Sequence, residues 1–260
     1  MSLAIRIIPC LLLKEWGIVK TVRFDEETYI GCPINAVRVF NANNVDELIL
    51  LDILATPKGR GIFTEILTQI TDESFMPITV GGGIRKQDDI REMLQHGADK
   101  IAINTAAVDD PGCIKAASAK FGRQCIVVSI DVRRTEGNVG EVFTQRGRKP
   151  TGLDPVDHAI HMEELGAGEI LLNSIDRDGT WDGYDVDLIR RVSEAVSIPV
   201  VACGGAGELQ HFADAVDIGG ASAVCAGSFF LFHGSRRGIL INFPSRNQLS
   251  SVLGKHRVRP

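Results

Sequence analysis

Eight short apolar runs recur along this chain, and segments with helical spacing separate most of them. The runs lie at residues 5–12, 47–53, 77–80, 100–104, 125–131, 169–173, 199–203 and 223–227. Helical spacing is found, for example, at residues 34–40, 62–70, 88–96, 155–165, 186–196 and 209–218. Strands that alternate with helices predict a parallel sheet, and eight such units predict that the sheet closes. The sequence therefore predicts a protein of the α/β class, with the 260 residues forming a single (βα)8 TIM barrel.

The two halves of the chain resemble each other at nearly constant offsets. The offsets are 119, 121, 123 and 123 for the pairs Leu12/Asp131, Asp52/Asn173, Gly81/Gly204 and Gly97/Gly220. We therefore expect half-barrels at residues 1–122 and 123–245, followed by a tail at 246–260. A duplicated barrel also predicts two similar anion sites on opposite sides of its mouth.

Charge and cysteine content narrow the classes of function. The 28 Lys and Arg against 33 Asp and Glu give a net charge of −5 and a pI near 5.7, so no basic field is available for nucleic acid or a membrane surface. The six cysteines contain no Cys-x-x-Cys pair, and the six histidines lie in expected helices or in the tail, so we expect neither a metal site nor a cofactor. Without a signal peptide or an apolar run of membrane-spanning length, a cytoplasmic protein acting on a small molecule is expected.

The apolar run at 125–131 ends in a single carboxylate, Asp131, followed by a polar loop. Its continuous apolar pattern is typical of a parallel strand that is covered on both faces. Parallel α/β folds place their chemistry at the carboxyl ends of the strands. Asp131 is therefore the first catalytic candidate.

Two glycine clusters each follow a predicted strand and precede a helix, and each is paired with another strand-to-helix junction one unit later. Glycine amides at such junctions can contact a phosphate that no side chain blocks. The sequence thus predicts a phosphate or similar anion at two sets of residues, Gly82, Gly83, Asn104 and Thr105 in the first half and Gly204, Gly205, Gly227 and Ser228 in the second. The alternative interpretation is that these glycines only shape tight turns.

A segment with two acids, a glycine and a hydroxyl follows the sixth predicted strand. It contains the candidate mouth residues Asn173, Asp176, Asp178 and Gly179, of which Asp178 and Gly179 are assigned to anion binding. The functional interpretation is a mobile substrate loop, and the alternative is an Asx-turn with solvated charges. Asp52, at the end of the second strand, is either a further mouth acid or a local cap acceptor.

Eight segments spread over nearly the whole chain carry a resemblance to one family. They are residues 6–10, 51–53, 80–84, 97–100, 103–107, 166–172, 174–180 and 204–207. Together they resemble the cyclase subunit of imidazole glycerol phosphate synthase. The resemblance implies a barrel that receives ammonia from a class I glutaminase docked on its amino-terminal face. It also implies a bisphosphorylated ribulosyl substrate, which is split and cyclised to imidazole glycerol phosphate.

One residue departs from the family at the point where its chemistry takes place. The resemblance implies catalytic aspartates at the ends of strands one and five; the second is Asp131, but Leu12 occupies the first position. A positioned acid or base contributes about 10²- to 10⁴-fold to a rate, so we expect the cyclase site to be impaired. Arg146, where the family has a small hydroxyl residue, suggests a different ligand.

The family's ring of charges at the ammonia entrance is retained. It corresponds to Arg6, Glu47, Lys100 and Glu169, all at the amino ends of predicted strands. The alternative interpretation is that these paired charges only close the barrel floor.

Three hypotheses follow. Residues 6–14, 19–24 and 238–244 are similar to a divergent branch of the family associated with surface-saccharide biosynthesis, so the first is ammonia supply to a separate sugar amidotransferase that makes acetamidino groups. The second is an authentic cyclase of histidine biosynthesis, in which Asp52, Asp178 or a water replaces the missing acid. The third is a non-enzymatic, phosphate-binding scaffold that only activates its glutaminase partner.

Overall fold

Eight parallel strands form a closed barrel in the structure, a computed structural model that describes residues 4–135, 140–234 and 236–254. The strands are β1 (Arg6–Lys14), β4 (Leu48–Asp52), β5 (Ile78–Gly81), β6 (Lys100–Ile103), β7 (Ile126–Arg134), β10 (Glu169–Ser174), β11 (Val200–Cys203) and β12 (Ala223–Ala226). They pair in chain order, β12 pairs with β1, and the pairing of β7 with β10 completes the circle. Each predicted apolar run overlaps one of these strands, and the closed parallel barrel confirms the TIM-barrel prediction.

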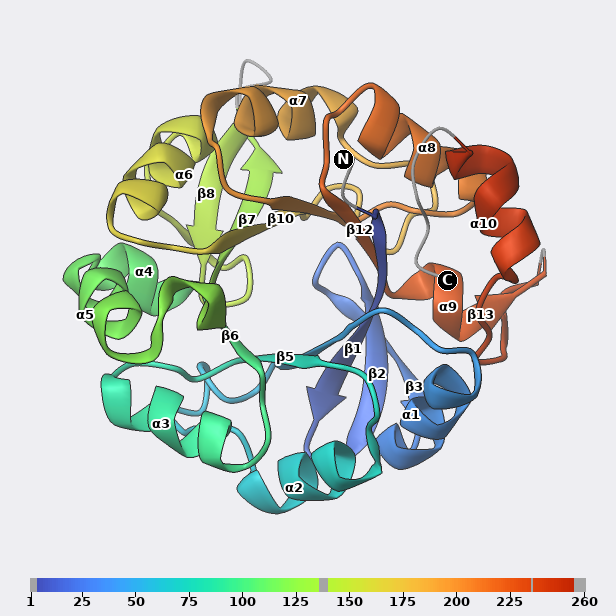
Figure 1. The fold of residues 1–260 in the computed structure, drawn as a ribbon, viewed down its shortest axis with the longest axis horizontal. Coiled ribbons are helices and arrows are strands. Elements are labelled where there is room, and N and C mark those ends of the chain that lie inside the picture. The colour runs from blue at the N-terminus through green and yellow to red at the C-terminus, as the bar shows by residue number, and fades with distance from the viewer. Residues whose placement is uncertain (1–3, 136–139, 235, 255–260) are drawn as a thin grey trace.

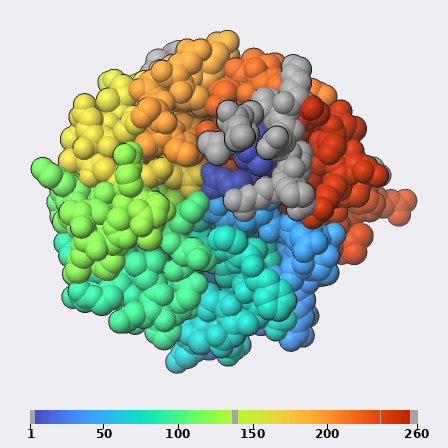
Figure 2. All heavy atoms as spheres, in the orientation of Figure 1, coloured from blue at the N-terminus to red at the C-terminus, as the bar shows by residue number. Residues whose placement is uncertain are grey.

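Helices surround the barrel in chain order, as the view along its axis shows (Figure 1). They are α1 (Pro33–Ala42), α2 (Thr64–Glu73), α3 (Gln87–Gln95), α4 (Thr105–Asp109), α5 (Gly112–Phe121), α6 (Pro155–Glu164), α7 (Val186–Ala195), α8 (Leu209–Asp217), α9 (Ser228–Leu231) and α10 (Arg246–Leu253). In the space-filling view the succession from blue to red continues around the circumference (Figure 2). Helix α5 was not predicted, because its buried face consists of little more than Ile114 and Ala117. None of the helices within the described ranges has the length and apolar content needed to cross a bilayer.

The strands are buried on both faces, which explains their continuous apolar sequence. One core lies between the sheet and the helices, and a smaller one fills the barrel interior. Ile8, Ile49, Val127, Leu171 and Val201 are among the interior side chains, each at most 2% exposed. The barrel is therefore packed between its floor and its mouth.

Two antiparallel hairpins extend the barrel at its mouth, and neither was predicted. The strands β2 (Gly17–Val22) and β3 (Glu26–Gly31) continue from β1, and β8 (Gly140–Thr144) and β9 (Lys149–Pro150) continue from β7. The strands β1 and β7 each have nine residues, so they project beyond their neighbours and pair with the returning chain.

Two helix caps recur at the spacing of the internal repeat, and the division into two half-barrels stays a prediction. In α3 the Asp89 carboxylate accepts from the amides of Arg85 and Lys86, and in α8 the His211 imidazole accepts from the amides of Gly207 and Glu208. The two caps lie 211 − 89 = 122 residues apart. This offset agrees with those found in the sequence.

The C-terminal segment is more ordered than a tail. The short strands β13 (Phe232–His233) and β14 (Gly238–Ile239) pair, and Ser245 caps α10 through the amide of Gln248. Helix α10 buries Leu249 and Leu253, which contradicts the predicted tail from residue 246 onward. The basic end of that tail, residues 255–260 with His256, lies outside the described residues.

Truncating a buried aromatic side chain tests the core. Phe230 is fully buried among Phe40, Phe212, Phe229 and Phe243, with ring centroids 5.1 to 6.4 Å away. Phe230→Ala is expected to lower the free energy of unfolding by about 3–5 kcal/mol, because it leaves a cavity. Urea unfolding measures the loss.

The matched control is the same substitution at Phe75, which is 91% exposed. Phe75→Ala is expected to change the unfolding free energy by no more than about 0.5 kcal/mol. Equal losses for the two variants would contradict the assigned core.

Candidate functional site

A cavity with about 1020 Å³ of open space, solvent included, lies at the carboxyl ends of the strands. It brings together many of the residues predicted from the sequence. Those that line it are Leu12, Asp52, Gly82, Gly83, Asn104, Thr105, Asp131, Arg146, Asn173, Asp178 and Gly227. The other predicted mouth residues, Asp176, Gly179, Gly204, Gly205 and Ser228, lie in the same loops outside the lining.

Asp131 lies near the carboxyl end of β7 and is buried. The pKa of its carboxyl group is raised to about 7, mainly by burial and also by the negative charges of Asp178 and Cys10. A hydrogen bond from Ser129 acts in the opposite direction and lowers this pKa. Asn104 Nδ2 donates a hydrogen bond to Oδ2 of Asp131 at 3.3 Å. A carboxyl group with this pKa can take or give a proton near neutral pH.

Leu12 faces the same cavity from β1. It is half-buried, packs against the interior core and is paired in register with Leu51 of β4, which also lines the cavity. Leu12 and Leu51 thus form an apolar patch on this side of the mouth, and Leu12 leaves Asp131 without the partner acid that the family resemblance implies.

The two acids considered as substitutes both have cationic partners. Asp178 accepts hydrogen bonds at both carboxylate oxygens from Lys20 Nζ, each at 2.8 Å, and a third from Thr21 Oγ1. Asp52 pairs with Arg60 Nη1 at 2.7 Å and accepts from two amides of its own loop, at Leu54 and Ala55. Asp52 is therefore a local loop acceptor as well as a lining residue.

Lys20 is the functional candidate that sequence reasoning missed. Its side chain is 5% exposed, lines the cavity and reaches from β2 to Asp178, 158 residues further along the chain. A lysine inside the apolar run Gly-Ile-Val-Lys-Thr-Val was the available signal, because an unpaired charge is costly to bury.

The glycines of the first cluster fit closely against a neighbouring loop. Gly82 and Gly83 have φ angles of 110° and 70°, and a Cβ atom at either would lie 2.2–2.3 Å from the carbonyl oxygen of Asp52 or Arg60. The amide of Gly83 donates to Thr56 Oγ1 at 3.1 Å. Close packing accounts for these glycines, and their position in the lining also leaves the cavity wall free of side chains.

The second cluster is packed in the same way, and it lies further from the cavity. Gly204 and Gly205 have φ angles of 87° and 117°, and a Cβ atom there would lie 2.5 Å from Asn173 Oδ1 or 2.2 Å from the carbonyl oxygen of Gly183. Gly227, which lines the cavity, leaves room for the side chain of Lys20. The two proposed anion sites thus differ in their access to the mouth.

Hydrogen bonds and close packing hold the end of β10 and the segment that follows it against neighbouring elements. Asp176 accepts from the amide of Arg134 at 2.7 Å, and Gly179 packs against the backbone of Thr21. Asn173 Oδ1 is buried within the cavity lining and has no hydrogen-bond partner among the described residues. An unsatisfied buried oxygen is costly, so a ligand that donates a hydrogen bond fits at Asn173.

Arg146 reaches the mouth from the turn between β8 and β9. Gln145 and Arg146 have φ angles of 51° and 62°, which are uncommon for residues other than glycine. Arg146 Nη2 binds Glu27 of β3 at 2.5 Å, and Lys14 binds the same carboxylate. The hydrogen bond from Lys14 and the pair with Arg146 lower the pKa of Glu27. The pair joins the two hairpins across the mouth.

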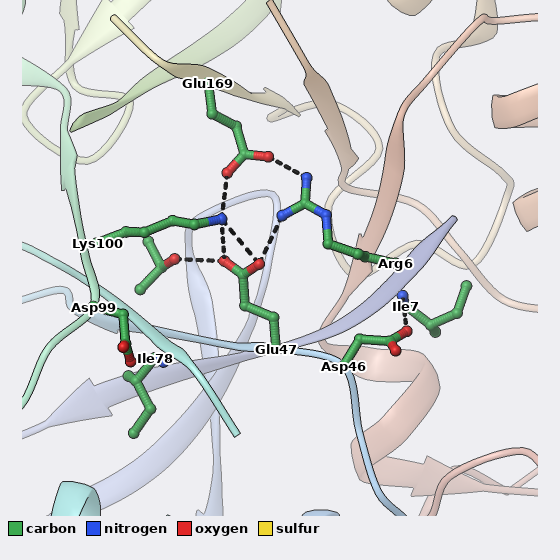
Figure 3. Close-up of polar contacts among 9 residues, drawn as sticks. Arg6, Ile7, Asp46, Glu47, Ile78, Asp99, Lys100 and Glu169 are labelled. Atoms are coloured by element: carbon green, nitrogen blue, oxygen red, sulfur yellow. Dashed lines mark hydrogen bonds and ion pairs between the residues drawn. The ribbon is translucent and has the colours of Figure 1, made fainter. Parts of the chain in front are cut away.

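The four charged residues of the predicted ammonia entrance converge at the opposite end of the barrel (Figure 3). Lys100 Nζ is 2.8 Å from Glu169 and 3.0 Å from both oxygens of Glu47, and Arg6 binds both glutamates. Burial by itself raises the pKa of Glu47, but the charges of Lys100 and Arg6 outweigh it and lower that pKa. These four residues are called the floor ring below.

No group of three or more His, Cys, Asp or Glu side chains in the described part of the chain is arranged to hold a metal ion.

The raised pKa of Asp131 predicts a pH-dependent stability. Between about pH 4 and about pH 7 the folded protein keeps a proton that the unfolded chain has lost, so the free energy of unfolding falls as the pH rises through this window. Asp131→Asn removes this loss. Relative to the unaltered protein, it is expected to gain about 2–4 kcal/mol between pH ~4.5 and pH ~8, measured by urea unfolding.

Asp157→Asn is the matched control, because Asp157 is exposed on α6. Its effect is expected to stay within about 0.5 kcal/mol. A constant difference between Asp131→Asn and the unaltered protein at both pH values would contradict a buried carboxyl with a raised pKa.

One family of known proteins matches this chain over most of its length. The family, described as histidine biosynthesis protein, matches residues 6–236. The match begins with the first residue of β1 and extends beyond β12, so it includes all eight barrel strands, the mouth residues and the floor ring. The chain therefore belongs to the histidine biosynthesis protein family.

Proposed function

We propose that this chain is the barrel subunit of a glutamine amidotransferase complex and passes ammonia from a glutaminase partner to an acceptor at its mouth. The acceptor is proposed to be a sugar that a separate amidotransferase converts to an acetamidino sugar. The observation that carries the proposal is the floor ring, an intact charged closure beneath an apolar interior. Membership of the family and the residue Leu12 support it.

The side chain of Lys100 can move out of the floor ring without leaving either glutamate unpaired. If the Lys100 side chain moves aside, Glu47 still has Arg6 and Thr79 Oγ1, and Glu169 still has Arg6. The Lys100 side chain is 21% exposed, so solvent can receive its ammonium group. A lysine on a flexible stem is thus a suitable movable element, whereas Arg6 holds the two glutamates together.

The interior above the ring favours a neutral molecule over an ion. Apolar side chains from several strands fill it, among them Ile49, Val127, Leu171 and Val201. Transfer of an ammonium ion into such surroundings is far more costly than transfer of ammonia. Because the interior is packed, transit requires brief side-chain motion.

The amino-terminal face also carries exposed apolar side chains that suit a protein partner. Phe75, in the loop before β5, is 91% exposed, and Ile218, in the loop before β12, is 56% exposed. Both loops lie at the amino ends of barrel strands, as the floor ring does. We propose this face for the glutaminase.

The mouth favours a second candidate, an authentic imidazole glycerol phosphate cyclase. The supporting observation is that Asp131, with a pKa near 7, shares one cavity with the Lys20–Asp178 pair and the proposed anion-binding residues Gly82, Asn104 and Thr105. Leu12 argues against it, because the two acids considered as replacements, Asp52 and Asp178, are already paired with cations.

Turnover with free ammonium separates the two candidates. The unaltered chain, given ammonium and the bisphosphorylated ribulosyl substrate, is expected to form essentially no imidazole product. Leu12→Asp restores an acid opposite Asp131 and is expected to raise the rate by about 10²-fold or more. Product formation is followed by chromatography.

Leu51→Asp is the matched control, since Leu51 is the register partner of Leu12 and lines the same cavity. It places a carboxylate at the wrong strand end and is expected to yield no gain. Rapid turnover by the unaltered chain would replace the first proposal with the second.

Transit through the floor ring is tested by removing its movable member. Lys100→Met is expected to lower the amount of aminated product per glutamine hydrolysed in the complex with the glutaminase. The reason is that the floor ring loses the ammonium group that pairs with Glu47 and Glu169. Lys120→Met, on the surface of α5, is the matched control and is expected to keep the ratio. Circular dichroism checks folding, and an unchanged ratio in Lys100→Met would contradict passage inside the barrel.

A further inference from the structure

The cations that line the mouth cavity differ in where their charge is balanced. Among the described residues these cations are Lys20 and Arg146. Lys20 is paired within the cavity, because its partner Asp178 belongs to the same lining. Arg146 is paired from outside, because its partner Glu27 is not part of that lining. Arg146 is therefore the cation that is better placed to meet a ligand in the cavity.

The guanidinium of Arg146 has hydrogen-bond donors to spare. A guanidinium carries five N–H groups. Within the described part of the chain, Arg146 has one hydrogen-bond partner, Glu27 Oε1, at 2.5 Å from Nη2. The Arg146 side chain is 13% exposed, so most of it is turned away from bulk solvent. A phosphate or carboxylate group can accept two parallel hydrogen bonds from a group of this kind.

Glu27 keeps a cationic partner when Arg146 leaves it. Arg146 binds Oε1 of Glu27, whereas Lys14 binds Oε2. The hydrogen bond from Lys14 is the largest cause of the lowered pKa of Glu27, and Arg146 contributes less, while burial opposes both. The Glu27 carboxylate thus remains paired with Lys14 if the Arg146 side chain turns into the cavity.

The turn that carries Arg146 lies beside the first predicted anion site. The amide of Gln145 donates to Thr105 Oγ1 at 3.2 Å, and Thr105 lines the cavity as well. A Cβ atom at Gly147 would lie 3.1 Å from the ring of Phe24, so the backbone of the turn is closely packed. The exchange of Glu27 for a ligand is therefore expected to require motion of the Arg146 side chain only.

Asn173 indicates a second group on the ligand. The residue is 8% exposed and lines the same cavity, and its Oδ1 has no hydrogen-bond partner among the described residues. A hydroxyl group can donate to this oxygen, whereas an ionised phosphate or carboxylate has no proton to donate. A ligand with hydroxyl groups and one anionic group therefore fits both residues.

We propose that Arg146 determines which ligand the mouth binds, by releasing Glu27 and binding the single phosphate or carboxylate group of a hydroxylated molecule, a sugar phosphate or a sugar acid. One exchangeable cation balances one anionic group, and a second phosphate would be buried without a cation to offset its cost. This ligand differs from the bisphosphorylated substrate that the family resemblance implies. The inference names the class of the acceptor at the mouth, and in that respect it rests on the proposed function.

Calorimetric titration of the full chain, without glutaminase or ammonia, keeps this test separate from that of ammonia passage. The probes are D-fructose 6-phosphate and D-glucuronate, and D-fructose is the neutral control. At least one charged probe is expected to bind, which also separates phosphate from carboxylate, and D-fructose is expected not to bind. D-Fructose 1,6-bisphosphate is expected to bind no more than about tenfold more tightly than the better probe, because its second phosphate gains no cation.

Two substitutions are expected to change the affinity in opposite directions. Arg146→Gln is expected to weaken binding of the better probe by about tenfold or more, because it removes charge-assisted hydrogen bonds. Glu27→Gln is expected to tighten binding about two- to fivefold, because it removes the carboxylate that competes for Arg146. The matched controls, Lys149→Met and Glu26→Gln, remove the same charges from exposed positions of the same hairpins. They are expected to keep the affinity within about twofold, because solvent screens these charges.

The gain in Glu27→Gln keeps the test decisive even if Arg146→Gln folds poorly, since misfolding cannot tighten binding. Circular dichroism checks the fold of each variant. Binding of neither charged probe, unchanged affinity in folded Arg146→Gln or no gain in Glu27→Gln would overturn the proposal. Equal changes in the controls, or a stronger preference for the bisphosphate than stated, would overturn it as well.

Discussion

The pairing of β7 with β10 runs from the floor of the barrel to its mouth. Its register runs from Glu169 opposite Val127 to Ser174 opposite Val132, and it closes the sheet into a barrel. The same pairing places Glu169 in the floor ring and sets Asn173 opposite Asp131 at the mouth. A shift by one residue would turn every side chain of β10 to the other face. The floor ring and the mouth therefore depend on one set of backbone hydrogen bonds.

The apolar interior separates two charged regions that differ in kind. At the floor, two cations and two anions are mutually paired, and the charges of Lys100 and Arg6 offset the cost of burying Glu47. At the mouth, Asp131 has no cationic partner among its named interactions, so burial raises its pKa. The floor is thus suited to a structural or gating role, and the mouth to proton transfer.

The mouth combines retained and altered features. The two hairpins meet over it through the pair of Arg146 and Glu27, and Lys20 reaches Asp178 from β2. Leu12 occupies the position where the family resemblance implies a partner acid for Asp131. The barrel scaffold is that of the family, and the residue at this strand end differs from the one that the resemblance implies.

The sequence by itself determined the barrel, because strands buried on both faces must be continuously apolar and their covering helices must alternate with them. It also indicated Asp131 as a candidate residue, from its place at a strand end. The four charged floor residues were expected from the family resemblance. The hairpins, α5 and α10 were missed, since their sequence patterns are short or weakly apolar. Tertiary structure alone decided the Lys20–Asp178 pair and the hydrogen bonds of Asp52 within its own loop. These depend on distances between residues far apart in the chain, which only the closure and register of the sheet determine.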